Sequence, residues 1–316
     1  MDENDPAQGL VGRVLHGRFA VWDVLARGGM GVLYAGRDTQ LDRAVVIKVV
    51  GPHALRSSAA GPRLVREAQL LRRVQHASIV AVHEVGLLET GEPFLVMERL
   101  EGRDLRRVLE EDGTLSPAQL AAILAPVADA LSALHAANVL HRDLKPENLF
   151  LLEGRVERPR VKILDFGLAM LDERSAERFT RSGQIVGTHD YVAPECVRGE
   201  RASAASDVYA LATTAFELLT GHLPFEGRGL DLLLAKASEA PTDLAAFLPS
   251  ASPALCEVFV AALAPDPSRR PTAVQLVQTL ARAASDDVLQ ARGDASLDTA
   301  GHAVDGASMP PSSARR

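Results

Sequence analysis

The spacing of apolar residues changes near Gly102, and this change limits what the chain can fold into. From Phe19 to about Val50 the apolar residues occur in short runs of the β type, FAVWDVL, GVLYAGRD and AVVIKVV. After Gly102 they recur at helical spacing in long stretches rich in alanine and leucine. This order predicts an α+β protein with a small β-rich N-terminal lobe and a larger, mostly α C-terminal lobe.

The helical predictions rest on periodicity and on capping signals. In the first part of the chain, one helix is predicted within residues 62–75, and PFLVMERL (93–100) is typical of another strand. In the second part, Ser116 and Gln119 have the spacing of a capping box, which predicts a helix start. Further helices are predicted over residues 206–220, 230–239, 253–263 and 272–284.

Composition and charge exclude several classes of function. The 316 residues carry a net charge of −7 with acidic and basic residues mixed throughout, so no basic stripe is available for a nucleic acid. Cys196 and Cys256 cannot build a disulfide framework, and no apolar run reaches the roughly 18 residues of a membrane span. We therefore expect a cytoplasmic protein with no nucleic-acid partner and no membrane segment within this chain.

Several short motifs suggest chemistry on a nucleotide. LARGGMGVLY (25–34) is compatible with a loop that closes over phosphates, and equally with an ordinary flexible turn. HRDLKPEN (141–148) is far more specific. It is followed by LDFG, which contains Asp165, and then by APE at 193–195.

In this order the motifs ARGGMG, VVIK, VREAQLL, HRDLKPEN, DFG, GTHDYVAPE, SDVYALA and DPSRRP resemble the Hanks-type serine/threonine protein kinases of bacteria. The resemblance implies a two-lobed protein kinase fold, ATP and Mg²⁺ as cofactors, and serine and threonine hydroxyls of proteins as acceptors. It implies an N-terminal extension (1–14), a kinase domain (15–283) and a tail (284–316) that we expect to be disordered. Within the domain, the N-lobe extends to about residue 98 and the C-lobe begins at about residue 102.

Transfer of a γ-phosphoryl group requires positioning and compensation of negative charge. By the resemblance, Lys48 on the third strand meets the α- and β-phosphates, and Glu67 on the helix holds Lys48 by an ion pair. The alternative for Lys48 is a solvated strand lysine, but the flanking VVI and VV would then bury an unpaired charge. Taken alone, Glu67 is also compatible with an ordinary surface charge on a helix.

Two segments carry the acceptor and metal roles that the resemblance implies. Asp143 orients the substrate hydroxyl and accepts its proton, while Lys145 offsets charge on the transferring phosphate. Asn148 and Asp165 supply oxygen ligands for Mg²⁺, which is a hard cation. Thr188 helps to place the hydroxyl near Asp143. Taken singly, Asp143 is also compatible with a loop salt bridge and Asp165 with a turn.

The glycine-rich loop departs from the family pattern. Gly28 and Gly31 stand at the second and third glycines of G-x-G-x-x-G-x-V, with Ala26 at the first position and Leu33 at the last. We interpret the loop as a phosphate cradle, in which Ala26 weakens nucleotide binding if the position needs a positive φ. Val46, where the family usually has alanine, enlarges a side chain expected to face the adenine.

The resemblance also assigns the connection between the lobes to VMERL. Met97 borders the adenine pocket or is plain core, and the backbone near Glu98 and Leu100 meets the base. Glu195 of APE pairs with Arg270 of DPSRRP as a structural ion pair.

Three classes of function remain open at this level. An ATP-dependent protein serine/threonine kinase is favoured over a pseudokinase that serves as an ATP-binding scaffold, because Lys48, Asp143 and Asp165 are all retained. A small-molecule kinase of similar fold is disfavoured, because APE and the segment before it build a site for peptides in the family.

Autophosphorylation is a further expectation. Arg142 carries a forked guanidinium that can clamp a phosphate. Thr180 and Ser182 lie near the middle of the polar stretch DERSAERFTRSGQIVGT, where a phosphate adds about −1.5 to −2 charges and can pair with Arg142. We expect phosphorylation at Thr180, Ser182 or both to raise activity toward other proteins.

Overall fold

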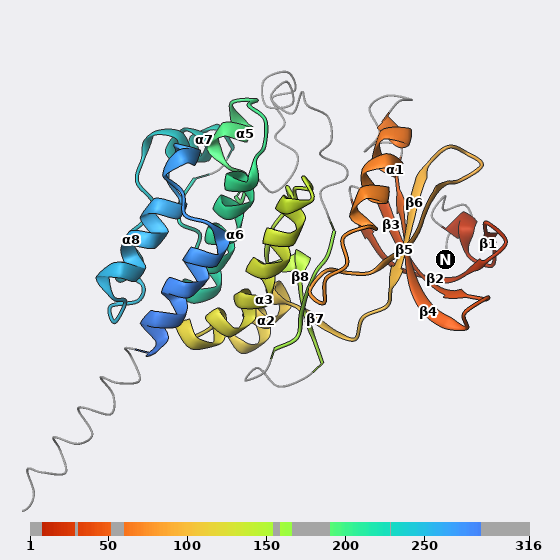
Figure 1. Ribbon diagram of the computed structural model, residues 1–316, viewed down its shortest axis with the longest axis horizontal. Coiled ribbons are helices and arrows are strands. Elements are labelled where there is room, and N and C mark those ends of the chain that lie inside the picture. Colours follow the sequence, from red (N-terminus) through yellow and green to blue (C-terminus); the bar gives the residue numbers. More distant parts are fainter. Residues whose placement is uncertain are drawn as a thin grey trace, which may run out of the picture.

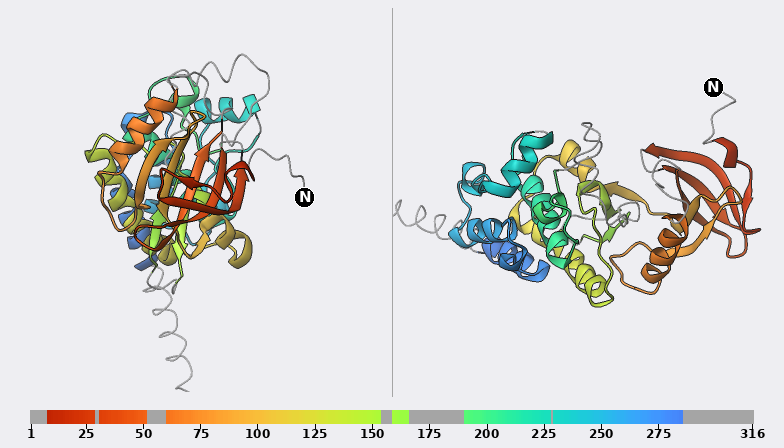
Figure 2. Two further views of the ribbon diagram at one scale, coloured as in Figure 1. Left: turned by 90° about the vertical axis from the view of Figure 1, so that its right-hand side faces the viewer. Right: turned by 90° about the horizontal axis from the view of Figure 1, so that it is seen from above.

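The chain folds into a β-rich lobe and a helical lobe that lie side by side (Figure 1). The computed structural model describes residues 8–28, 31–51, 60–153, 159–165, 190–227 and 229–285. The α+β class predicted from the sequence is confirmed. The right-hand view in Figure 2 shows the N-terminal sheet with helix α1 at one end of the molecule and the helical lobe at the other.

One antiparallel sheet with the strand order β1-β2-β3-β4-β6-β5 forms most of the N-terminal lobe. Helix α1 packs against β5 and β6 of this sheet. The elements are η1 (Gln8–Leu10), β1 (Val14–Leu15), β2 (Phe19–Gly28), β3 (Gly31–Asp38), β4 (Arg43–Val50), α1 (Ala60–Leu71), β5 (Val82–Leu87) and β6 (Pro93–Glu98).

The two faces of this sheet have different surroundings, because successive side chains of a strand point to opposite faces. Phe19, Tyr34 and Ile47 face one side and contribute to a core that belongs to the N-terminal lobe alone. Val46 and Met97 face the other side, in a hydrophobic cluster that continues into the helical lobe. The second face is therefore the one that meets the other lobe.

Two strands of the sheet carried little signal in the sequence. Strand β1 has two residues, and the segment before it also joins the fold, since the N–H of Gly12 donates to the carbonyl of Val21 at 2.9 Å. In β5 only Val85 and Gly86 are buried, so the alternation of apolar and polar residues is weak. Because the β5 sequence has little β pattern of its own, its pairing with the strongly apolar β6 fixes it as a strand.

The helical lobe also contains a small sheet of order β7-β8-β9 that carries the loops of the site. Helix α3 begins with the capping box predicted at Ser116, whose hydroxyl accepts from the N–H of Gln119 at 3.2 Å. The elements are β7 (Gly102–Asp104), α2 (Leu105–Asp112), α3 (Pro117–Ala136), η3 (Pro146–Asn148), β8 (Leu149–Leu152), β9 (Val161–Ile163), α5 (Pro194–Val197), α6 (Ala204–Thr220), α7 (Gly229–Ser238), η5 (Leu244–Ala246), α8 (Pro253–Ala262), η6 (Pro267–Arg269) and a helix over 273–285.

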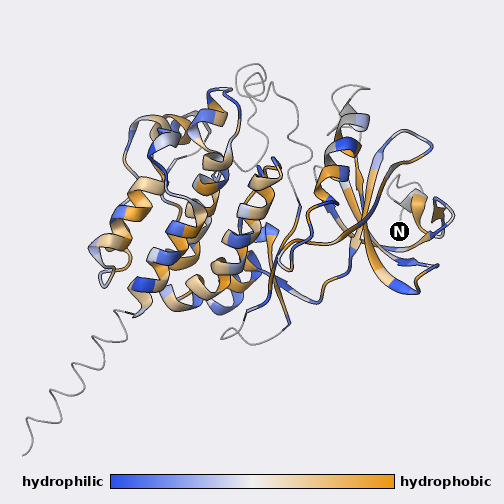
Figure 3. Ribbon diagram, viewed as in Figure 1, coloured by the Kyte–Doolittle hydropathy of each residue, from blue (hydrophilic) through white to orange (hydrophobic). Residues whose placement is uncertain are grey.

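Helix α6 is the buried centre of this lobe. Every residue from Ser206 to Leu219 is buried, and α6 packs against α3 and α8. Figure 3 shows hydrophobic residues along the N-terminal strands and along the helices of this lobe. Two charged side chains within this buried stretch, Asp207 and Glu217, therefore need polar partners inside the protein.

Within the described residues, α3 alone has the length and apolar composition of a membrane-crossing helix. Its apolar face packs in the core, where Leu120, Leu124, Val127 and Leu131 are all fully buried. Half of its apolar window is buried inside the fold. These contacts are those of a core helix.

The lobes meet at a second place besides the connection from β6 to β7. The segment after α1 pairs with β9, because the N–H of Ile163 donates to the carbonyl of Ser78 at 2.8 Å and the N–H of Val80 donates to the carbonyl of Ile163 at 3.1 Å. These bonds fix the start of the segment that leads to Asp165.

Candidate active site

Cross-strand pairing places the predicted nucleotide-binding residues of the sheet in two adjacent rows. Ala26 pairs with Leu33, and Leu33 pairs with Lys48. In the next row Val46 pairs with Met97. Paired residues share one face of a sheet. These five residues therefore lie together on the face that meets the helical lobe.

Ala26 fits its position without backbone strain. It belongs to the paired part of β2, and it is absent from the non-glycine residues with positive φ in the described part of the chain. Gly31 does need to be glycine, because its φ is 146° and a Cβ there would lie 2.0 Å from the carbonyl oxygen of Val49. The condition under which Ala26 weakens nucleotide binding is therefore not met.

We expect Ala26→Gly to leave the affinity for ATP unchanged, because the backbone there already has the geometry of a paired strand. The free energy of unfolding should fall by about 0.4–1 kcal/mol, since glycine makes the unfolded chain more flexible. Isothermal titration with ATP and Mg²⁺, together with urea unfolding, measures both quantities. A change in ATP affinity of about tenfold or more would contradict this interpretation of the loop.

Lys48 reaches from the sheet to the segment after β9. Its Nζ lies 2.8 Å from Oδ1 of Asp165, and the two side chains are 18% and 33% exposed. The ion pair is thus partly shielded from water. Attraction between opposite charges is stronger in such a place than at the surface. Glu67, the predicted partner of Lys48, belongs to α1 through its backbone, but its side chain lies outside the described residues.

Asp143, Lys145 and Asn148 contact one another in the loop that leads into η3. Nζ of Lys145 lies 3.0 Å from Oδ2 of Asp143. The amide nitrogen of Asn148 donates to the same carboxylate at 2.9 Å and to the Asp143 carbonyl at 2.6 Å. The carbonyl of Asn148 accepts from the N–H of Leu164 at 2.8 Å, which places this loop beside Asp165.

A buried carboxylate on α6 shapes the loop. Asp207 accepts the N–H of His141 at 2.9 Å and the N–H of Arg142 at 2.8 Å, and it lies 2.8 Å from Nε2 of His135. Arg142 has a φ of 68°, an unfavourable conformation that these bonds support. Motif reasoning gave Asp207 no role, although a carboxylate inside an apolar helical run indicates a buried partner.

His141 is a neutral ring at the base of the loop. It is fully buried, and burial lowers its pKa even though Asp207 acts in the opposite direction. Nε2 contacts the carbonyl of Leu164 at 2.7 Å, and Nδ1 accepts from the N–H of Asp143 at 3.3 Å. One nitrogen donates and the other accepts, as a neutral imidazole requires.

The donor set of the loop suits a Mg²⁺ ion. Because the amide nitrogen of Asn148 is bound to Asp143, the Asn148 amide oxygen is directed elsewhere. Asp165 adds a carboxylate, and both oxygens are of the kind that Mg²⁺ prefers together with phosphate and water. In the described part, no group of three or more His, Cys, Asp or Glu side chains is placed to hold a metal ion, and phosphate and water would complete the coordination here.

The Glu98 side chain fixes the connection between the lobes. Its Oε1 accepts from the N–H of Ala81 at 2.7 Å and from Nζ of Lys162 at 2.5 Å. Glu98 therefore uses its side chain for structure, which is compatible with the prediction that only the backbone there meets a base. Met97 is 8% exposed and belongs to the shared cluster, and Leu100 packs against that cluster.

A second polar cluster beside the loop was missed by motif reasoning. Arg106 of α2 donates to Glu217 at 2.8 and 3.1 Å, to the hydroxyl of Tyr191 at 2.7 Å, and to Glu147 at 3.3 Å. The Tyr191 hydroxyl also donates to Glu217, and burial together with this bond raises the pKa of Tyr191. These residues are far apart in the sequence, so no local pattern could pair them.

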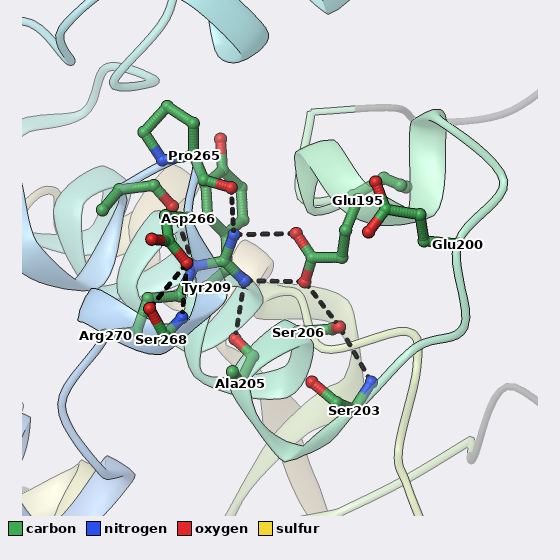
Figure 4. A network of polar contacts seen from close by, with 12 residues as sticks. Glu195, Glu200, Ser203, Ala205, Ser206, Tyr209, Pro265, Asp266, Ser268 and Arg270 are labelled. Atoms are coloured by element: carbon green, nitrogen blue, oxygen red, sulfur yellow. Dashed lines mark hydrogen bonds and ion pairs between the residues drawn. The ribbon is translucent and has the colours of Figure 1, made fainter.

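The predicted pairing of Glu195 with Arg270 is confirmed (Figure 4). The two terminal guanidinium nitrogens, Nη1 and Nη2, each donate to the carboxylate at 2.7 Å, and the side chains of Arg270 and Glu195 are 0% and 2% exposed. Ser206 donates to the same carboxylate at 2.7 Å, and Arg270 also donates to the carbonyl of Ala264 at 2.9 Å. The pair joins the start of α5 to the segment after η6.

Three predicted residues lie outside the described part of the chain. Thr188, Thr180 and Ser182 all fall within residues 166–189, and nothing in the structure bears on them.

The two lobes, the loop that carries Asp143 and the pairing of Lys48 with Asp165 define the class of a protein kinase. The protein kinase domain family matches residues 19–280. The chain belongs to this family, and its relatives place it among the Hanks-type bacterial serine/threonine kinases.

Among the similar proteins is the probable serine/threonine-protein kinase PknB of Corynebacterium glutamicum, 36% identical over 278 residues, which cover 85% of this chain and 42% of that protein. Another is the serine/threonine-protein kinase pkn3 of Myxococcus xanthus, 34% identical over 84% of this chain and 49% of that protein. The chain thus spans less than half the length of these relatives. A solved structure, the PknI kinase domain of Mycobacterium tuberculosis with a C20A mutation, is 26% identical, with a TM-score of 0.70 over 87% of this chain and 99% of that one.

Proposed function

We propose that the chain transfers the γ-phosphoryl group of ATP to serine and threonine hydroxyls of proteins in a Mg²⁺-dependent reaction. One observation supports this proposal most directly. Lys48 pairs with Asp165, Asp143 is hydrogen-bonded to Asn148, and the backbone bond from Leu164 to Asn148 brings these two pairs beside each other at the junction of the lobes. The names of the relatives support the choice of serine and threonine as acceptors.

In this proposal each residue of the group acts on charge or position. Asp143 orients the acceptor hydroxyl and takes its proton as the oxygen bonds to the γ-phosphorus and the bond to the β-phosphate oxygen breaks, leaving ADP. Lys48 holds the α- and β-phosphates, and Lys145 offsets charge on the transferring group. Asn148 and Asp165 would hold Mg²⁺, which compensates phosphate charge when bound.

The remaining proposed contacts surround the nucleotide and the acceptor. The hairpin of β2 and β3 covers the phosphates, Thr188 helps to place the hydroxyl, and Glu67 steadies Lys48. The base lies between the sheet face and the connection of the lobes. The residues proposed to surround the nucleotide are Ala26, Gly28, Gly31, Leu33, Val46, Met97, Glu98 and Leu100.

Incubation with γ-labelled ATP and Mg²⁺, followed by mapping of phosphosites on the chain and on a cell lysate, tests the proposal. Label on serine and threonine residues of proteins is the expected result. Nucleotide binding without any transfer would support the pseudokinase scaffold instead. Transfer only to small molecules in the lysate would support a small-molecule kinase.

We also propose that the chain phosphorylates its own copies at Thr180, Ser182 or both. A phosphate near Arg142, which precedes the proposed catalytic aspartate, would bring positive and negative charge together and order the segment that carries Thr188.

We also propose a cytoplasmic location, which suits an acidic, soluble kinase fold.

The double variant Thr180→Ala/Ser182→Ala is expected to lose the acceleration that follows preincubation with ATP. Mass spectrometry before and after incubation identifies the sites, and progress curves with a protein substrate measure the lag and the rate. If the double variant matches the wild type in both, control by these phosphates is wrong. Arg142 then keeps its structural role, in which its backbone N–H donates to Asp207 and supports the loop.

A further inference from the structure

Lys236 is a buried lysine that the proposed chemistry does not use. It lies in the last turn of α7 and is 1% exposed. Its Nζ donates to the carbonyl of Asp190 and, at 3.1 Å, to the carbonyl of Val192. The ammonium also lies 5.5 Å from the centre of the Tyr209 ring on α6, within the range of a cation–π interaction.

The two carbonyls belong to one short segment with a defined place in the fold. Residues 190–193 directly precede α5, and they follow Thr188 after a single intervening residue. The side chain of Tyr191, between the two carbonyls, is held by Arg106 and Glu217. Lys236 thus holds the backbone of residues 190–193, while the Tyr191 side chain of the same segment is held by Arg106 and Glu217.

The buried position of Lys236 has a cost in global stability. Burial lowers the pKa of Lys236 from 10.5 to about 7, although the Asp190 carboxylate acts in the opposite direction. The unfolded chain therefore binds more protons at this residue between these two pH values, so the buried amine favours unfolding as the pH falls from 10.5 toward 7. An apolar side chain of similar length would avoid this cost, but it would leave the carbonyls of Asp190 and Val192 without this donor.

The places of the few lysines in this chain also suggest that Lys236 serves the site. Only four of the 34 basic residues are lysines. Lys48 and Lys145 contact carboxylates of the proposed site, and Lys162 contacts Glu98 at the connection of the lobes. Lys236 is the fourth, and it too contacts a segment that adjoins the site.

We propose that Lys236 is a positioning residue for protein substrates: from α7 it holds the backbone of residues 190–193 in the shape that receives the acceptor peptide. The amine nitrogen of a lysine can donate to two carbonyls of one segment, which an apolar side chain cannot do. The inference rests on the proposed transfer to proteins and names a residue that determines how the acceptor is bound.

The experiment compares Lys236→Met, which removes the charge at similar length, with Lys236→Arg, which keeps charge and donors. Dephosphorylated casein serves as the protein substrate, and KM for casein and for ATP are measured separately. For Lys236→Met we expect KM for casein to rise by about tenfold or more, with KM for ATP unchanged and the melting temperature within about 4 °C of the wild type. Lys236→Arg should bind casein better than Lys236→Met. Ser238→Ala, an exposed change on the same helix, should match the wild type.

Hydrogen–deuterium exchange without nucleotide provides a readout that does not depend on activity. Amides of residues 190–198 should exchange faster in Lys236→Met than in the wild type, while those of α3 should not change. Equal exchange and equal KM for casein would overturn the inference while leaving the proposed function intact, and so would a Lys236→Met protein that fails to fold. A wild type that phosphorylates no protein would refute the proposed function, and exchange would then decide whether Lys236 holds the segment.

Discussion

Asp143→Asn is expected to reduce phosphoryl transfer by about 100- to 10,000-fold, the contribution typical of a positioned general base. Asn has the same shape as Asp but cannot take a proton from the acceptor hydroxyl. The loop should keep its conformation, because its backbone is held by Asp207 rather than by the Asp143 carboxylate. The affinity for ATP should stay close to that of the wild type, since the removed charge orients the hydroxyl and does not hold the nucleotide.

Turnover with saturating ATP and a protein substrate measures the loss, and isothermal titration measures ATP affinity. Asp129→Asn is a matched control, because Asp129 is an exposed aspartate on α3, and it should leave both quantities unchanged. Unchanged turnover in Asp143→Asn would remove Asp143 from the catalytic role. Loss of both turnover and ATP binding would assign it to nucleotide binding instead.

The largest effect on stability is expected from Arg270→Ala. This change leaves the buried carboxylate of Glu195 without its two guanidinium bonds, and removing one partner of a buried ion pair costs about 3–5 kcal/mol. Urea unfolding measures the loss in the free energy of unfolding. The control is Arg198→Ala, which breaks the exposed pair with Glu200 and should cost no more than about 1 kcal/mol.

The same pair sets a dependence of stability on pH. Burial acts to raise the pKa of Glu195, but bonds from Arg270 and Ser206 outweigh it and hold the pKa below its ordinary 4.5. Because the pKa of Glu195 is lower in the folded state, its ionised carboxylate stabilises the fold fully above the unfolded pKa of 4.5. This contribution is lost as the pH falls through the folded pKa. The difference in stability between wild type and Arg270→Ala should therefore shrink in acid. A difference that stays constant from neutral pH to acid would contradict the assignment.

Much of the fold and of the candidate site was predictable from local patterns. The spacing of Ser116 and Gln119 alone predicts the capping box that begins α3, and the structure confirms it. The pairing of Glu195 with Arg270 came from the family resemblance and is also confirmed. The roles of Asp143, Lys145, Asn148 and Asp165 stay predictions, although the structure brings these residues together.

Other features had no local signal. Strand β5 is half-exposed and depends on β6 for its pairing, so its own sequence is ambiguous. The contacts of Arg106 with Glu217 and Tyr191 join residues from three separate segments. Whether Ala26 needs a positive φ could be answered only from the backbone of the structure, because the residue type does not determine the φ angle at that position.

By itself the sequence determined the two-lobed class, the main strands and helices, and the identity of the chemical groups, because periodicity, capping and motif spacing are properties of neighbouring residues. Apart from the pair of Glu195 with Arg270, the tertiary structure alone decided which buried charges meet. Asp207 shapes the loop of Asp143, and Lys236 holds residues 190–193, through contacts between segments distant in the chain. The physical reason is that a charge removed from water must find a partner in three dimensions, and the place of that partner depends on the packing of whole helices rather than on local sequence.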